Sequence, residues 1–187
     1  MRVIAGKFGS RRLRTLRGMA LRPTSDRLRE TLFDILGPTV EDSLFFDVFA
    51  GSGAIGIEAL SRGARRVIFI EQHVPAAKQI RENLNSLGIK MDGEILAIDA
   101  IQGLERLASR HALADFIFLD PPYALAADYL RVLDFLDSSH LLAPDGIVIV
   151  EHRKKMQLPM QLYRLECSRT VEQGDSSLSF YRLAMAA

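Results

Sequence analysis

The eight residues from Phe116 to Tyr123 place a carboxylate and two prolines directly after an apolar run. Such a run is typical of a buried strand that delivers Asp120 to its carboxyl end, where α/β enzymes bind their ligands. Proline cannot extend a central strand and has no N–H, so we expect the carbonyl of Pro121 to be a free, fixed acceptor. With the Asp120 carboxylate, it can hold an NH2 group. Tyr123 offers a face on which a nucleobase can stack. The candidate catalytic residues are Asp120, Pro121, Pro122 and Tyr123.

Those four residues would also fit an ordinary strand that ends in a proline turn, and the loop 47–56 decides between the two interpretations. It reads Asp-Val-Phe-Ala-Gly-Ser-Gly-Ala-Ile-Gly and follows the apolar run 44–46. A strand, a glycine turn and a helix in this order predict a nucleotide-binding unit. Gly51 and Gly53 allow a tight turn close to a ligand, and Gly56 allows the helix to pack on the strand. The G-x-G-x-x-G spacing fits a dinucleotide fold equally well.

Acidic residues after successive strands indicate which cofactor the loop binds. Glu71 follows the apolar run 66–70 and can accept both hydroxyls of a ribose, which either cofactor class requires. Asp47, just before the glycines, suits a cationic amino-acid group, and Asp99 ends the third strand candidate. These two acids favour S-adenosylmethionine over NAD. The expected cofactor contacts are Asp47, Phe49, Ala50, Gly51, Ser52, Gly53, Glu71, Gln72, Asp99, Ala100 and Asp120.

The amino-terminal segment is strongly basic, although the net charge of the chain is only +1. Residues 1–30 carry nine basic and two acidic side chains, so they sum to +7 and the rest of the chain to −6. A basic end on an acidic body indicates a polyanionic partner. Segments 3–5 (Val-Ile-Ala) and 13–16 (Leu-Arg-Thr-Leu) bracket Gly6 and Gly9 as a short hairpin would, which predicts an ordered arm rather than a flexible tail. Because no lipid-facing apolar stripe accompanies the arm, RNA is the expected partner and a membrane is not.

At this point the chain resembles the RsmD-type 16S ribosomal RNA guanine-N2 methyltransferases, a family of class I S-adenosylmethionine-dependent enzymes. The resemblance covers nearly the whole chain, and its motifs are 1–7 (MRVIAGK), 22–27 (RPTSDR), 49–53 (FAGSG) and 120–123 (DPPY). It implies methyl transfer to a guanine of 16S ribosomal RNA by a cytoplasmic, monomeric enzyme, on an assembled or partly assembled small subunit. It also implies that Arg22 and Thr24 lie over the cofactor or the target base. From the residues alone, Pro23 and Thr24 could equally well just start a helix. The candidate substrate-binding residues are Arg2, Lys7, Arg11, Arg12, Arg14, Arg22 and Thr24.

These residues require an alternation of strands and helices to hold them. The predicted strands are 44–49, 66–71, 93–98, 115–120 and 146–151, and the predicted helices are 24–36, 54–62, 75–87, 100–110 and 125–137. This pattern predicts a mostly parallel sheet covered on both faces. Segments 162–170 and 177–183 form a hairpin instead, and class I methyltransferases end their sheet with such a reversed strand. We therefore expect a Rossmann-like class I methyltransferase fold: a seven-stranded sheet in a domain of residues 23–187, preceded by a basic β-hairpin arm, 1–22.

Composition excludes several classes of protein. A chain of 187 residues with 48% hydrophobic residues predicts a single domain with a substantial core. The sequence has neither an apolar stretch long enough to span a bilayer nor a secretory signal, so we expect it to stay in the cytoplasm. Cys167 is the only cysteine, which excludes an internal disulfide, and the four histidines lack the spacing of metal ligands.

Three alternatives stay open from the residues alone. An NAD-dependent oxidoreductase would explain the glycine loop and Glu71 but not the 120–123 motif or the basic arm. A noncatalytic RNA-binding protein would explain the arm but would not need Asp120, Glu71 and the glycine loop together. Among methyltransferases, the same motif serves adenine-N6, cytosine-N4 and protein glutamine acceptors, and only the family resemblance selects guanine.

Overall fold

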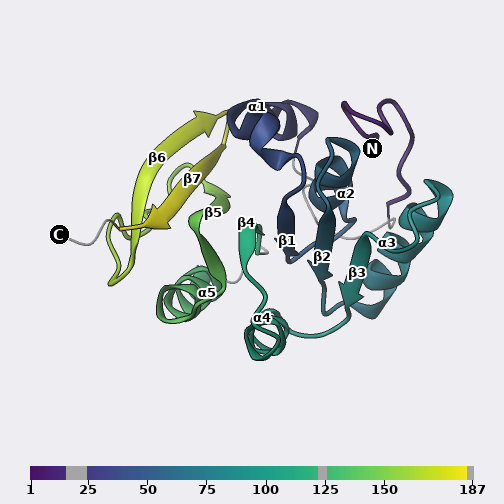
Figure 1. Ribbon diagram of the computed structural model, residues 1–187. Coiled ribbons are helices and arrows are strands. Elements are labelled where there is room, and N and C mark those ends of the chain that lie inside the picture. The colour runs from purple at the N-terminus through teal and green to yellow at the C-terminus, as the bar shows by residue number, and fades with distance from the viewer. Residues whose placement is uncertain (16–24, 122–125, 185–187) are drawn as a thin grey trace.

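A single seven-stranded sheet forms the centre of the molecule in the computed structural model, which describes residues 1–15, 25–121 and 126–184 (Figure 1). The strands are β1 (Leu44–Val48), β2 (Arg66–Ile70), β3 (Gly93–Leu96), β4 (Ala114–Leu119), β5 (Leu142–Arg153), β6 (Leu165–Gln173) and β7 (Ser176–Leu183). Their order is β3-β2-β1-β4-β5-β7-β6; β1 to β5 are mutually parallel, and β7 is antiparallel to both of its neighbours. The predicted sheet with a reversed terminal strand is confirmed.

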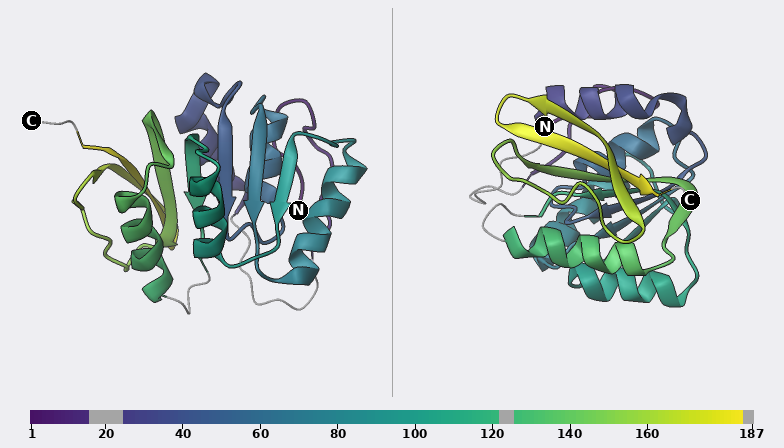
Figure 2. Two further views of the ribbon diagram at one scale, coloured as in Figure 1. Left: turned by 60° about the horizontal axis from the view of Figure 1, so that its bottom comes forward. Right: turned by 90° about the vertical axis from the view of Figure 1, so that its left-hand side faces the viewer.

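Helices cover both faces of this sheet, as the pattern of the sequence predicts (Figure 2). They are α1 (Asp26–Leu36), the 3-10 helix η1 (Gly37–Val40), α2 (Ala54–Ser61), α3 (Val74–Ser86), α4 (Ala100–Ser109) and α5 (Ala126–Ser138). Helices α1, α2 and α3 share one hydrophobic cluster with the sheet, and α4 and α5 share the other. Successive residues of the central strand β1 serve opposite faces: Phe45 packs in the first cluster and Phe46 in the second.

Most element boundaries agree with the predicted ones, and the differences have local causes. Helix α1 begins at Asp26, two residues after the start of the predicted helix 24–36, because the Ser25 hydroxyl caps it by accepting from the Leu28 N–H at 3.1 Å. Strand β3 is shorter than the predicted 93–98, because the chain leaves the sheet before Asp99 caps α4. Strand β5 begins earlier than the predicted 146–151, since Leu142 already pairs with Ala114 across an irregular register.

The amino-terminal arm, defined here as residues 1–15, packs on the outside of α2 and α3 (Figure 1). Val3 and Leu13 are buried in the same cluster as those helices. The two halves of the arm pair through one isolated β-bridge, between Arg2 and Arg12, so the predicted β-hairpin is a hairpin turn without regular strands. The reason is that several of its N–H groups donate to α2 and α3 rather than to the opposite half of the arm.

Candidate active site

The strand register places three predicted site segments at the same position along the strand direction, at the carboxyl ends of β1, β2 and β4. Val48 of β1 lies opposite Ile70 of β2 and opposite Leu119 of β4. The residues that follow them are the start of the glycine loop, Glu71 and Asp120, so all three leave the same edge of adjacent parallel strands. Strand order reverses direction between β1 and β4, which is the position where open α/β sheets bind ligands.

The glycine loop turns sharply between β1 and α2. Phe49, Gly51 and Gly53 have positive φ angles of 64°, 54° and 75°. The Ala50 N–H donates to the Ile70 carbonyl at 3.0 Å, which ties the loop to β2. A non-glycine residue in this left-handed region costs on the order of 1–3 kcal/mol, and such strain concentrates at ligand sites. Phe49 was selected from the sequence as a cofactor contact, and its conformation marks the loop as a constrained site.

Gly56 has a packing role rather than a turning role. A Cβ atom at this position would lie 2.7 Å from the Val67 Cγ1, closer than side chains approach one another. The absence of a side chain therefore allows α2 to lie directly on β2, as the glycine spacing predicts.

Glu71 connects the end of β2 to the glycine loop. One carboxylate oxygen accepts from the Gly51 N–H at 2.7 Å, and the other accepts from the His73 N–H at 2.7 Å. Each carboxylate oxygen has two lone pairs, so both can accept a further donor such as a ribose hydroxyl. Glu71 thus shapes the loop in addition to the ligand-binding role expected of it.

Asp47 lies beneath the loop, with only 2% of its surface exposed. Its Oδ2 accepts from the Gly56 N–H at 2.9 Å in the first turn of α2. Burial raises the pKa of Asp47 to about 8; the hydrogen bond from Gly56 lowers this pKa, and the negative charge of Glu71 raises it. The carboxyl group is therefore mostly protonated at neutral pH, and a cation bound nearby would favour its ionisation.

Asp99, a predicted cofactor contact, lies between β3 and α4. The Asp99 carboxylate caps α4 by accepting from the Ile101 N–H at 2.9 Å, and it pairs with Arg131 at 3.1 Å. Ala100 is buried, whereas Gln72 is exposed. Apart from Asp47, which lies within β1, the predicted cofactor contacts thus follow β1, β2 and β3 in turn, with Asp120 after β4.

The candidate catalytic end of β4 differs from the sequence-based expectation in one respect. Asp120 is half-buried and Pro121 is buried. The Pro121 carbonyl was expected to be free, but it accepts from the Tyr129 hydroxyl of α5 at 3.2 Å. Tyr129 is fully buried, so it fixes the direction of that carbonyl, whose second lone pair can still accept. Pro122 and Tyr123 lie outside the described residues.

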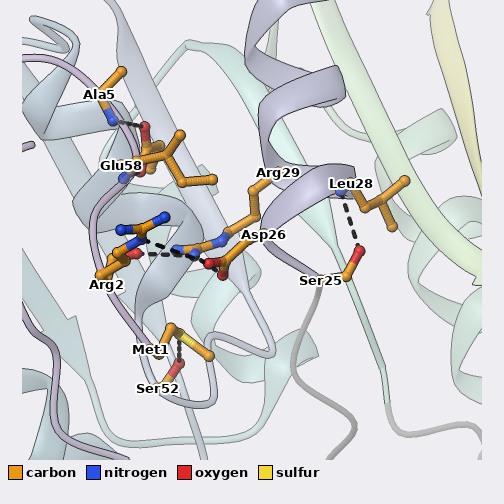
Figure 3. Close-up of polar contacts among 10 residues, drawn as sticks. Met1, Arg2, Ala5, Ser25, Asp26, Leu28, Arg29, Ser52 and Glu58 are labelled. Carbon is orange, nitrogen blue, oxygen red and sulfur yellow. Dashed lines mark hydrogen bonds and ion pairs between the residues drawn. The ribbon is translucent and has the colours of Figure 1, made fainter. Parts of the chain in front are cut away.

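The basic side chains of the arm face solvent. Those of the described residues are Arg2, Lys7, Arg11, Arg12 and Arg14, and all are exposed. Arg22 and Thr24 lie outside the described residues. Arg29 counts in the basic segment 1–30 but cannot contact a polyanion, because its side chain is fully buried. It donates to the Arg2 carbonyl at 2.9 Å and pairs with Asp26 at 2.7 Å, so it holds the arm instead (Figure 3).

Three further residues that no motif identified hold the arm on the domain. The buried Glu58 carboxylate of α2 accepts from the Ile4 N–H at 2.7 Å and the Ala5 N–H at 3.0 Å (Figure 3). Ser61 accepts from the arm at 2.9 Å through its hydroxyl, and Asn83 of α3 pairs with the backbone of Arg14. One signal was available in the sequence: Glu58 and Asn83 are polar residues on the buried faces of their helices.

No group of three or more potential metal ligands occurs in residues 1–15, 25–121 and 126–184. Within the same residues, no helix is both long and apolar enough to cross a membrane.

Comparison with solved structures defines the class of the fold. The structure of yhhF from Escherichia coli superposes with a TM-score of 0.85 and 28% identity, covering 99% of both chains. An RNA methyltransferase from Salinibacter ruber, in complex with S-adenosyl-L-homocysteine, matches at a TM-score of 0.64 and 16% identity over 88% of this chain and 95% of that chain. The molecule has the class I methyltransferase fold.

Comparison of sequences defines the family. The family model described as conserved hypothetical protein 95 matches residues 1–182. YlbH of Bacillus subtilis is 34% identical over 97% of this chain and 98% of its own length. The ribosomal RNA small subunit methyltransferase D of Haemophilus influenzae is 35% identical over 84% of this chain and 81% of its own. The protein belongs to this family, which is the RsmD family.

Proposed function

We propose that this protein transfers a methyl group from S-adenosylmethionine to the exocyclic N2 amine of a guanine in 16S ribosomal RNA of the small subunit. The observation that carries the proposal is the level register of β1, β2 and β4, which brings the glycine loop, Glu71 and Asp120 to one edge of the sheet. The RsmD relatives, which are named ribosomal RNA small subunit methyltransferases, support the substrate class.

The residues at this edge fit S-adenosylmethionine by charge and hydrogen bonding. Carboxyl groups lie near the carboxyl ends of four strands: Asp47 within β1, and Glu71, Asp99 and Asp120 after β2, β3 and β4. Glu71, Asp99 and Asp120 suit a ligand that is cationic and rich in donors, and such a ligand would favour ionisation of the protonated Asp47, whereas the pyrophosphate of a dinucleotide would meet like charge. Glu71 would accept the ribose hydroxyls, and the glycine loop would lie against the amino-acid part. When bound, the cofactor supplies a methyl group activated by a sulfonium leaving group.

The chain's own residues then have to position an amine and remove its proton. In the proposed step a carbon–nitrogen bond forms as the carbon–sulfur bond breaks, and the sulfur departs with the bonding electrons as a neutral thioether. Asp120 and the Pro121 carbonyl would accept hydrogen bonds from the NH2 group and direct its lone pair toward the methyl group. The methylated nitrogen is transiently cationic, and its proton passes to Asp120 or to water.

Tyr129 contributes to this placement because it fixes the Pro121 carbonyl from the buried side. Guanine N2 is inaccessible within a duplex, so the target base has to be unpaired or flipped. Tyr123 is proposed as the surface on which it stacks, and Arg22 and Thr24 as neighbours of the cofactor or the base.

The exposed basic arm supports RNA as the substrate. Residues 1–15 carry five basic side chains and no acidic one. Phosphate contacts position a protein without specifying sequence, so we propose that the shape of a partly or fully assembled small subunit selects the target. The enzyme would then act in the cytoplasm, as a monomer.

The decisive experiment measures methyl transfer to 16S ribosomal RNA and to small subunits that lack the modification, and identifies the modified nucleoside by mass spectrometry. Methylation of N2 of guanine supports the proposal; methylation of adenine-N6 or cytosine-N4 would move the acceptor to another base. If the protein binds both S-adenosylmethionine and RNA but transfers no methyl group, it is a noncatalytic RNA-binding protein.

A variant separates chemistry from binding. Asp120→Ala should abolish turnover and leave the affinity for S-adenosylmethionine within a few fold, because the carboxylate acts on the amine. Turnover near that of the unmodified protein, in a variant that still melts cooperatively, would contradict this role.

A further inference from the structure

Both ends of the amino-terminal arm converge on one residue of the glycine loop. The Ser52 hydroxyl donates to the Met1 sulfur at 3.6 Å (Figure 3). The Ser52 carbonyl accepts from the Asn83 side chain at 3.3 Å, and the same side chain pairs with Arg14 near the other end of the arm. Met1 and Leu13 are themselves joined, since the Leu13 N–H donates to the Met1 carbonyl at 3.1 Å.

Asn83 is the central residue of this connection. Only 1% of its surface is exposed, and it lies on the buried face of α3. Its Oδ1 accepts from the Arg14 N–H at 2.9 Å, while its NH2 group donates to the Arg14 carbonyl at 3.0 Å and to the Ser52 carbonyl. One buried amide therefore uses its donors and its acceptor to join the arm to the loop.

The two joined segments have different proposed ligands. In the proposed function, the exposed Arg11, Arg12 and Arg14 of the arm would bind RNA, and the loop from Phe49 to Gly53 would bind the cofactor. Restriction of either segment by its own ligand also restricts the other, because Asn83 makes the N–H to oxygen hydrogen bonds that join them, whereas the Ser52–Met1 contact reaches only a weakly accepting sulfur. The second ligand then binds a segment that is already ordered, so its binding costs less conformational entropy and needs no large structural change.

We propose that RNA binding on the arm and cofactor binding at the glycine loop are positively coupled, and that Asn83 is the positioning residue that transmits this coupling. The inference rests on the proposed function, because it takes the arm as the RNA surface and the loop as the cofactor site. Thermodynamic linkage makes the coupling reciprocal: each ligand has to raise the affinity for the other by the same factor.

The test measures this factor directly with S-adenosylhomocysteine and unmodified 16S ribosomal RNA. Calorimetry gives the affinity for S-adenosylhomocysteine with and without saturating RNA. We expect RNA to raise that affinity at least about fivefold, the lower end of typical couplings between sites. Asn83→Ala should reduce the factor to near one. Gln79→Ala is the matched control: Gln79 is a buried amide one turn earlier on α3, whose side chain donates to Glu82.

Hydrogen exchange on the unaltered protein provides a second measurement that does not depend on the folding of any variant. Addition of S-adenosylhomocysteine should slow exchange of the Arg14 N–H, which donates to Asn83 on the side away from the loop. Exchange of Phe116 and Ile117 in the interior of the sheet serves as the unaffected reference.

The outcomes separate this inference from the proposed function. Failure of the protein to bind either ligand would overturn the proposed function. Binding of both ligands with a factor of one, and with unchanged exchange at Arg14, would overturn the coupling while leaving the proposed function intact. A factor that persists in Asn83→Ala would overturn the role of Asn83.

Discussion

Substitution of Glu58 tests whether the arm is held as a fixed part of the domain. The Glu58 side chain is fully buried and accepts from the N–H groups of Ile4 and Ala5. It also pairs with the Arg62 Nε at 2.9 Å. Glu58→Ala therefore leaves two arm N–H groups and one largely buried cation without their acceptor.

The size of the effect follows from these three contacts. Hydrogen bonds to a charged group contribute about 1.5–3 kcal/mol each, but the contributions are not additive. Arg62 keeps other partners, since it lies 3.9 Å from Asp34 and 5.1 Å from the Phe33 ring. The arm N–H groups can reach water if the arm detaches. We therefore expect a loss of about 3–5 kcal/mol in the free energy of unfolding, the usual cost of breaking a buried ion pair.

Urea unfolding measures this loss, and Glu94→Ala provides the control. Like Glu58, Glu94 pairs with arginine, but it does so at the surface: Arg66 and Arg110 each lie 2.7 Å from its carboxylate. Such pairs contribute about 0–1 kcal/mol. Trypsin should also cleave Glu58→Ala after Arg11, Arg12 and Arg14 faster than it cleaves the control. If Glu58→Ala loses no more stability than Glu94→Ala and resists trypsin equally, then Glu58 does not hold the arm.

Three further predictions concern the acids and the arm. Burial raises the pKa of Asp47 from 3.8 to about 8, so the folded state retains a proton that the unfolded state releases. The free energy of unfolding should therefore fall as pH rises from about 4 to 8. Asp47→Asn should flatten that decline, as measured by urea unfolding at a series of pH values. Glu71→Ala should weaken S-adenosylmethionine by about 1.5–3 kcal/mol per charged hydrogen bond lost, and unchanged affinity by calorimetry in a folded variant would remove Glu71 from the site. The logarithm of RNA affinity should fall linearly with the logarithm of salt concentration, and each arginine removed among Arg11, Arg12 and Arg14 should lower the slope by about 0.7–0.9. Arg169→Ala, on the edge strand β6 across the sheet from the arm, should leave that slope unchanged.

The sequence alone was sufficient to predict the sheet and the positions of the acids along it. Apolar runs that end in Asp or Glu are local signals, and parallel strands bring their carboxyl ends to one edge whatever the details of packing. Glu71 and Asp120 could therefore be assigned to the ends of β2 and β4 before any contact was known. The glycine spacing likewise predicted the turn at Gly51 and the close packing of α2 at Gly56, because both depend on the absence of a side chain at a single position.

Only the tertiary structure decided which polar groups are already occupied and which surface the arm covers. The Pro121 carbonyl accepts from Tyr129. Asn83 binds Arg14, 69 residues away in the chain, and Ser52, 31 residues away. No local pattern encodes such contacts, because they depend on how separate elements pack. The charge of Arg29 illustrates the same limit: composition counts it with the basic arm, whereas packing buries it beneath that arm. Charge is a property of the sequence, but exposure is a property of the fold.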